Sequence, residues 1–159
     1  MTFEGFRAEL QSEIEELEKL NDDFQEYIQS HEEPYEWDEL RVLAGLLHDF
    51  YNGVENYFKR VVTRIDQYPD VLEGDESHQA LLRYMSQKVE NTRPPVISDQ
   101  LRDELEDYLR FRHVVRHAYG HRYKWDRMKS LVINYPDVYS SVNKELTSFL
   151  ESQLPIDSN

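Results

Sequence analysis

Residues 3–30 read FEGFRAELQSEIEELEKLNDDFQEYIQS, and the architecture follows from this stretch because its apolar residues keep one helical repeat. Neighbouring apolar residues are three or four positions apart throughout, the spacing of a single helix face: Phe3, Phe6, Leu10, Ile14, Leu17, Leu20, Phe24 and Ile28. We therefore predict a helix from Thr2, its expected N-cap, to Ser30, about 40 Å long. Its other face is strongly acidic, which favours exposure to solvent.

The rest of the chain contains further helical patterns, and no segment shows the alternation of a strand. Pro34 ends the first helix, and the second is predicted from Trp37 or Asp38 to about Asp66. Four more helical segments follow, with a turn expected at residues 134–137. They are a helix capped by Ser77 that includes Val89 and is ended by Arg93-Pro94-Pro95, then Ser98 to Tyr119 with Gly120 as C-cap, Trp125 to Ile133, and Val138 to Gln153.

These patterns predict an all-α protein, an antiparallel bundle of four to five helices with a long acidic N-terminal helix. We expect one domain over residues 1–155, composed of the acidic helix (1–33) and the bundle (38–153), and a frayed tail at 156–159. Gly45 and Gly53 lie eight positions apart within the second helix. Glycine weakens a helix, so we expect another helix to approach closely there.

Composition excludes several classes of protein. The 159 residues carry a formal net charge of −14, unlike the basic surface of a nonspecific nucleic-acid coat. There is no cysteine, which excludes disulfides, thiolate zinc sites and cysteine nucleophiles. No signal peptide and no apolar run long enough to span a membrane is present, so we expect a cytoplasmic protein without membrane contact.

Charge is distributed unevenly along the chain. Residues 1–40 hold 14 acidic and 2 basic side chains, whereas residues 108–125 hold no acidic side chain. This second stretch, the basic segment, contains five basic residues and three histidines: Arg110, Arg112, Arg116, Arg122 and Lys124, with His113, His117 and His121. The acidic first helix is either an ordinary solvated surface or an electrostatic shield for the basic segment.

Three interpretations of the basic segment remain open from the residues alone. In the first, Arg112 lies on the apolar stripe of its helix as a structural group paired with an acid from another helix. In the second, His113, His117 and His121 bind a metal, although Gly120 interrupts their helix. In the third, Arg112 binds an RNA phosphate and a histidine moves protons, so that the 2′-hydroxyl attacks its own phosphate.

Arg112, His117 and Tyr119 form an Arg-x4-His-x-Tyr sequence, and here the chain resembles the HepT-like toxins of the HEPN ribonuclease superfamily. The resemblance covers roughly residues 38–153. Such toxins most often have asparagine after the arginine, where this chain has His113.

The resemblance implies a metal-independent endoribonuclease, the toxin of a toxin–antitoxin pair, that acts as a homodimer and leaves a cyclic phosphate on RNA. Arg112 would bind the scissile phosphate and His117 would transfer protons, with His113 and Arg116 as supporting groups. The implied partner is a minimal nucleotidyltransferase antitoxin, which transfers AMP to Tyr119 and so blocks the site. No cofactor is expected.

A second hypothesis belongs to a different class of protein. The chain would be a catalytically silent helical module that binds a nucleotidyltransferase partner or a nucleotide, and Arg112 would be structural. Toxicity on expression that disappears when His117 is replaced by alanine would separate the two hypotheses.

Overall fold

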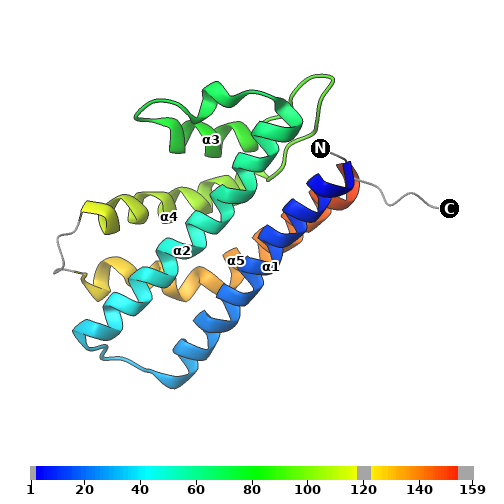
Figure 1. Ribbon diagram of the computed structural model, residues 1–159. Coiled ribbons are helices and arrows are strands. Elements are labelled where there is room, and N and C mark those ends of the chain that lie inside the picture. Colours follow the sequence, from blue (N-terminus) through cyan, green and yellow to red (C-terminus); the bar gives the residue numbers. More distant parts are fainter. Residues whose placement is uncertain (1–2, 118–122, 154–159) are drawn as a thin grey trace.

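The computed structural model describes residues 3–117 and 123–153, and these form five α-helices. Figure 1 shows α1 running beside α2 and the later part of α5, while α3 lies across the end of α2. The predicted all-α bundle with a long N-terminal helix is therefore confirmed. The helices are α1 (Phe3–Ser30), α2 (Trp37–Val61), α3 (Ser77–Met85), α4 (Asp99–His117) and α5 (Trp125–Gln153).

The predicted apolar stripe of α1 packs against α2 and α5. Leu10, Leu17 and Phe24 are all buried there. A Cβ atom at Gly53 would lie 2.7 Å from Cδ2 of Leu17, so a side chain at this position would require Leu17 of α1 to shift. The expectation fails for Gly45, because nothing lies within 4 Å of its Cβ position.

α2 ends in a π-helical turn, Val62–Asp66, where a buried ion pair joins it to the segment after α3. The side chains of Asp66 and Arg93 are both fully buried, with Arg93 Nε 2.8 Å from Asp66 Oδ1. The same guanidinium donates to the backbone carbonyls of Gln87 at 2.8 Å, Pro94 at 3.1 Å and Tyr84 at 3.4 Å. Arg93 thus fixes the connection from α3 to α4 against the end of α2.

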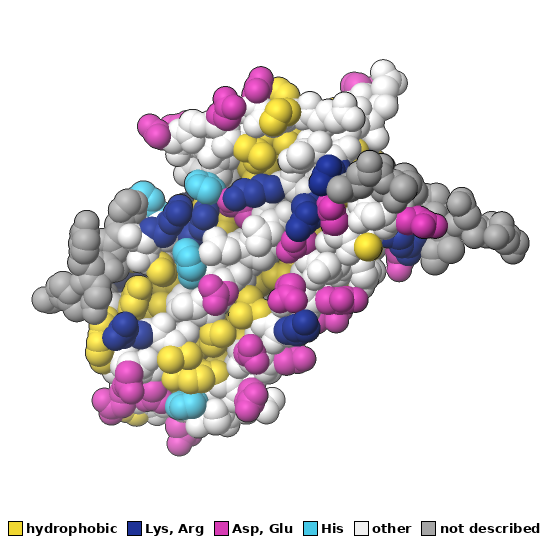
Figure 2. All heavy atoms as spheres, in the orientation of Figure 1, with side chains coloured by type: hydrophobic (Ala, Val, Ile, Leu, Met, Phe, Trp, Pro, Cys, Tyr) yellow, Lys and Arg dark blue, Asp and Glu magenta, His cyan; other side chains and the backbone are white. Residues whose placement is uncertain are grey.

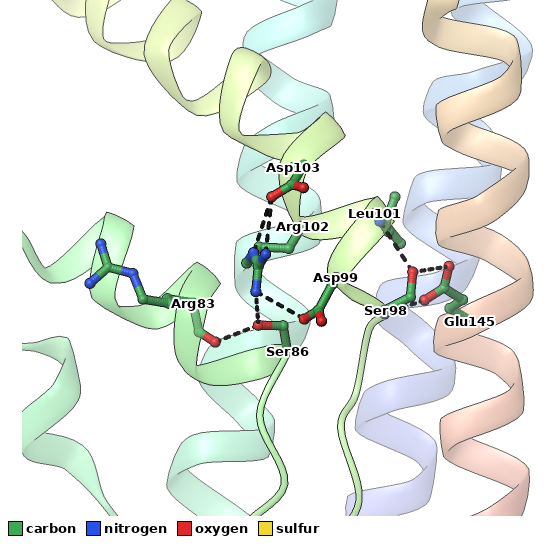
Figure 3. Close-up of polar contacts among 8 residues, drawn as sticks. All are labelled: Arg83, Ser86, Ser98, Asp99, Leu101, Arg102, Asp103 and Glu145. Carbon is green, nitrogen blue, oxygen red and sulfur yellow. Dashed lines mark hydrogen bonds and ion pairs between the residues drawn. The ribbon is translucent and has the colours of Figure 1, made fainter.

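The start of α4, at the predicted Ser98, is held by a side-chain cap and by α5. Ser98 Oγ accepts a hydrogen bond from the Leu101 backbone N–H at 3.1 Å, as expected of an N-cap. Glu145 of α5 accepts from both the Ser98 backbone N–H at 2.6 Å and the Ser98 hydroxyl at 3.2 Å (Figure 3). Arg102 donates to Ser86 Oγ at 3.1 Å, which ties the same turn to the end of α3.

α3 departs from its prediction at both ends. Ser77 is the first helical residue and Glu76 occupies the cap position, without a side-chain cap bond. The helix ends at Met85, and Val89 instead forms an isolated bridge with Arg93. The hydrogen bonds of Arg93 to the carbonyls that follow α3 give the chain this alternative to a longer helix.

The turn predicted at residues 134–137 is wrong, because α5 continues through Pro136. Tyr135 is fully buried, and its ring stacks on Phe24 of α1 at 3.9 Å between centroids. Tyr108 of α4 donates from its hydroxyl to the Leu131 carbonyl at 2.8 Å. These contacts hold the helix across the proline, although proline by itself disfavours a helix interior. Figure 1 shows α5 changing direction along its length, which is typical of a proline within a helix.

None of the helices within the described residues combines the length and apolar character needed to cross a membrane.

Candidate functional site

A pocket of about 340 Å³ lies between the start of α3 and the second half of α4. α4 contributes most of the basic lining, and α3 and the loop before it contribute His78 and two acidic side chains, Asp75 and Glu76. The α4 side chains that line it include Arg110, Arg112, His113 and Arg116. Figure 2 shows basic and histidine side chains gathered where α2, α3 and α4 meet, while acidic side chains cover much of the face along α1.

Arg112 lies at the base of this pocket, with only 7% of its surface exposed. Its position on the α4 stripe with Leu105 and Tyr108 explains the burial, because that stripe faces the core. The acid that such an arginine needs is Glu55 of α2, whose Oε2 accepts from Arg112 Nη1 at the long distance of 3.4 Å. Arg112 therefore has the acidic partner that the first interpretation requires, but the hydrogen bond between the two side chains is long.

Two buried donors beside Glu55 lack a hydrogen-bond partner among the described residues. They are Arg112 Nε and the hydroxyl of Tyr51. Burial raises the pKa of Tyr51 well above 10, and Glu55 raises it further while Arg112 acts in the opposite direction. Buried donors normally have an acceptor, and an anion or a water molecule at this place would accept hydrogen bonds from these two groups.

His78 of α3 completes the group around Glu55. Its Nδ1 lies 2.7 Å from Glu55 Oε1 and 2.9 Å from Arg112 Nη1. Lys59 Nζ is 3.4 Å from the same carboxylate oxygen. Glu55, at 2% side-chain exposure, thus sits among three basic groups, which stabilise its charge although it is buried.

His48 of α2 lies near the same cluster, and its pKa is lowered from 6.5. Burial is the main cause; Asp49 acts against it, and the charges of Arg112 and Arg116 lower the pKa further. Its Nε2 accepts a hydrogen bond from Asn52 at 2.9 Å, so the proton of the neutral ring is on Nδ1. Nδ1 is buried and has no hydrogen-bond partner within the described part of the chain.

This lowered pKa predicts a loss of stability in mild acid. His48 binds a proton less readily in the folded protein than in the unfolded chain. Its contribution to the free energy of unfolding is therefore fully present above pH 6.5 and is lost as the pH falls toward the folded-state pKa. His48→Gln keeps an acceptor for Asn52 but removes the titration. Urea midpoints measured above and below pH 6.5 should therefore shift less in the variant than in the wild type. An equal shift in both proteins would contradict this assignment.

The structure describes only part of the predicted site. It brings Arg112, His113 and Arg116 to one pocket, with the last two exposed. His117 is the final residue of α4, and its side chain, like Tyr119 and His121, lies outside the described residues.

Arg110, one of the basic side chains of the segment, is engaged locally. Its Nη1 donates to Asp107 at 3.0 Å, one turn earlier in α4. Its Nη2 lies 3.5 Å from Glu106. These acids offset its charge, which favours its role as an ordinary surface residue.

Sequence reasoning missed three groups of the site, which are Glu55, His78 and His48. A signal existed for Glu55, because it lies four positions after Tyr51 and three before Phe58, on the buried face of α2. A carboxylate in that register must be buried and needs a cation. No comparable pattern marks His78, whose position depends on how α3 packs.

Comparison with known families gives one match that covers most of the chain. The model of a family described as HepT-like protein matches residues 42–153. No curated protein and no solved structure matches the chain. The matched range contains α3, α4, α5 and nearly all of α2, and it excludes α1.

Proposed function

Because the chain belongs to the HepT-like family, we propose that its basic pocket binds RNA and that the protein is a ribonuclease toxin of a toxin–antitoxin pair. The observation that carries this proposal is Arg112. It is a buried guanidinium at the base of a pocket, with an unpartnered Nε among the described residues, a long bond from Nη1 to Glu55 at 3.4 Å and a 2.9 Å contact from the same Nη1 to His78. A phosphate would supply the short, charge-assisted bonds that Glu55 does not.

The proposed reaction is an attack of an RNA 2′-hydroxyl on the neighbouring phosphate. Arg112 holds that phosphate and stabilises the charge that develops on it, with Arg116 beside it at the pocket. His117, one turn of α4 beyond His113, transfers a proton. His113 supports the site as a polar group facing the same pocket. No cofactor or metal takes part.

A homodimer would place two copies of this pocket along one basic cleft. The net charge of −14 makes a single small pocket a weak attractor for a long RNA, whereas two pockets double the local positive charge. The proposed dimer would concentrate positive charge at one face, which favours RNA binding there although the protein as a whole is acidic.

The proposed function is tested with purified protein and a defined RNA in EDTA. Cleavage should continue, and the products should end in a cyclic phosphate and a 5′-hydroxyl, because the reaction needs only Arg112 and histidine. Light scattering on the same sample should give a dimer. Absence of cleavage would refute the function, and cleavage lost in EDTA but restored by zinc would favour the three-histidine metal interpretation.

Tyr119 is the proposed point of neutralisation by a minimal nucleotidyltransferase. AMP on this tyrosine would place a phosphate near Arg112 and exclude the RNA phosphate, since two anions do not share one guanidinium favourably. Co-expression with a minimal nucleotidyltransferase partner should add mass in units of AMP to Tyr119 and suppress toxicity. A Tyr119→Phe protein should stay toxic in the presence of the partner. Full neutralisation of this variant would contradict the proposal.

One observation favours the second candidate function, a silent helical module. Arg112 does have an acidic partner from another helix, as a purely structural arginine would. Expression alone separates the candidates, because a silent module is not toxic and cleaves no RNA.

A further inference from the structure

Glu55 and His78 lie outside the Arg-x4-His-x-Tyr sequence, yet they form a carboxylate–histidine pair at the pocket. The carboxylate is 2% exposed and the imidazole 34% exposed, with 2.7 Å between Oε1 and Nδ1. We propose that His78, oriented by Glu55, is the group that accepts the proton of the attacking 2′-hydroxyl. This inference rests on the proposed ribonuclease function and adds a second proton-transfer residue to it.

The tautomer of His78 follows from the groups that surround its Nδ1. This atom contacts both Glu55 Oε1 and Arg112 Nη1, and it can form a hydrogen bond with only one of them. A lone pair directed at a buried carboxylate 2.7 Å away would be repelled, whereas an Nδ1–H would be attracted. Arg112 also donates to Glu55, at Oε2, so two donors converge on one carboxylate and lie close together.

A proton on Nδ1 leaves Nε2 as an acceptor. The two ring nitrogens point in different directions, so when Nδ1 faces the buried Glu55, Nε2 belongs to the exposed part of the ring. His78 lines the same pocket as Arg112 and Arg116. The side chain that would hold the phosphate is thus 2.9 Å from the imidazole that would take the proton.

The proposed step conserves atoms and charge. His78 Nε2 takes the proton of the 2′-hydroxyl, and the 2′-oxygen forms a bond to phosphorus. The bond from phosphorus to the 5′-oxygen breaks, and that oxygen takes a proton from the imidazolium of His117. The products are a 2′,3′-cyclic phosphate and a 5′-hydroxyl, with His78 protonated and His117 neutral. Exchange with water restores both histidines.

The charged and polar groups at the pocket beside His78 come from α2, from α4 and from the loop before α3. They contact Glu55 or His78, or they line the same pocket: Glu55, Lys59, Arg110, Arg112, His113, Arg116, Asp75 and Glu76.

His78→Asn is the decisive variant. The asparagine amide can donate to Glu55 as Nδ1–H does, but it has no titrating group at the Nε2 position. We expect the variant to keep its fold and its affinity for RNA and to lose cleavage by about 10²–10⁴-fold. His31→Asn, at the far end of α1, is the matched control and should cleave as the wild type does.

A substrate with sulfur at the 5′ leaving position separates the two proton-transfer roles. A thiolate leaves without protonation, so this RNA should restore cleavage to His117→Ala but not to His78→Asn. If His78→Asn cleaves ordinary RNA at the wild-type rate, or is restored by the sulfur substrate, His78 is not the proton acceptor, and the proposed function still stands. If the wild type cleaves no RNA, both the proposed function and this inference are wrong.

Discussion

Replacing His117 with alanine is expected to reduce RNA cleavage by about 10²–10⁴-fold, the range for loss of a general acid or base. Growth inhibition should disappear with it. His117 is the last described residue of α4, and alanine favours a helix, so the fold should persist. Cleavage rates of the purified protein, growth curves on expression and circular dichroism measure the three effects.

His31→Ala serves as the control for the chemistry of the change. His31 follows α1, stacks on Tyr27 and does not line the pocket. It should stay toxic and active. A folded His117→Ala protein with full ribonuclease activity would remove His117 from the reaction.

Replacing Arg93 with alanine is expected to lower the free energy of unfolding by about 3–5 kcal/mol, because it leaves Asp66 buried without its cation. The change also deprives the carbonyls of Gln87, Pro94 and Tyr84 of a donor. Since small domains are stable by only about 5–15 kcal/mol, the loss is a large share of the total. Urea denaturation followed by circular dichroism measures it.

Two further variants test the cause of that loss. Arg83→Ala removes an exposed arginine from α3 and should change stability little. Replacing the pair together, Arg93→Met with Asp66→Leu, should recover the part of the stability that is lost to the unpaired charge, because no charge is then left buried, while the three carbonyls still lack their donor. A nearly normal stability of Arg93→Ala alone would show that Asp66 gains solvent or another partner.

Periodicity predicted the parts of the fold in which each helix buries one continuous face. The α1 stripe and the α4 residues Leu101, Leu105 and Tyr108 are buried as expected. The same rule marked Arg112 as an arginine that needs an acid, a phosphate or a partner surface, and Glu55 is such an acid. The same periodicity places Glu55 on the buried face of α2, where a carboxylate needs a cation, and the structure shows that this cation includes Arg112.

The features that the sequence did not predict depend on contacts between distant segments. Pro136 suggested a turn, but Tyr135 is locked against Phe24 from α1, more than a hundred residues earlier. Arg93 precedes two prolines and shows no pattern that indicates burial with Asp66. His78 reaches the site only because α3 packs beside α4.

The close contact between Gly53 of α2 and Leu17 of α1 bears on how relatives of this chain are compared. The family match begins at residue 42 and leaves out α1, yet Leu17 of α1 occupies the space that a side chain at position 53 would need. In this chain the packed core therefore extends beyond the matched range. A fragment starting at residue 42 would expose the apolar surfaces of α2 and α5 to water and self-associate. In an alignment of HepT-like proteins, glycine at this position would mark the chains that carry a first helix docked in the same register.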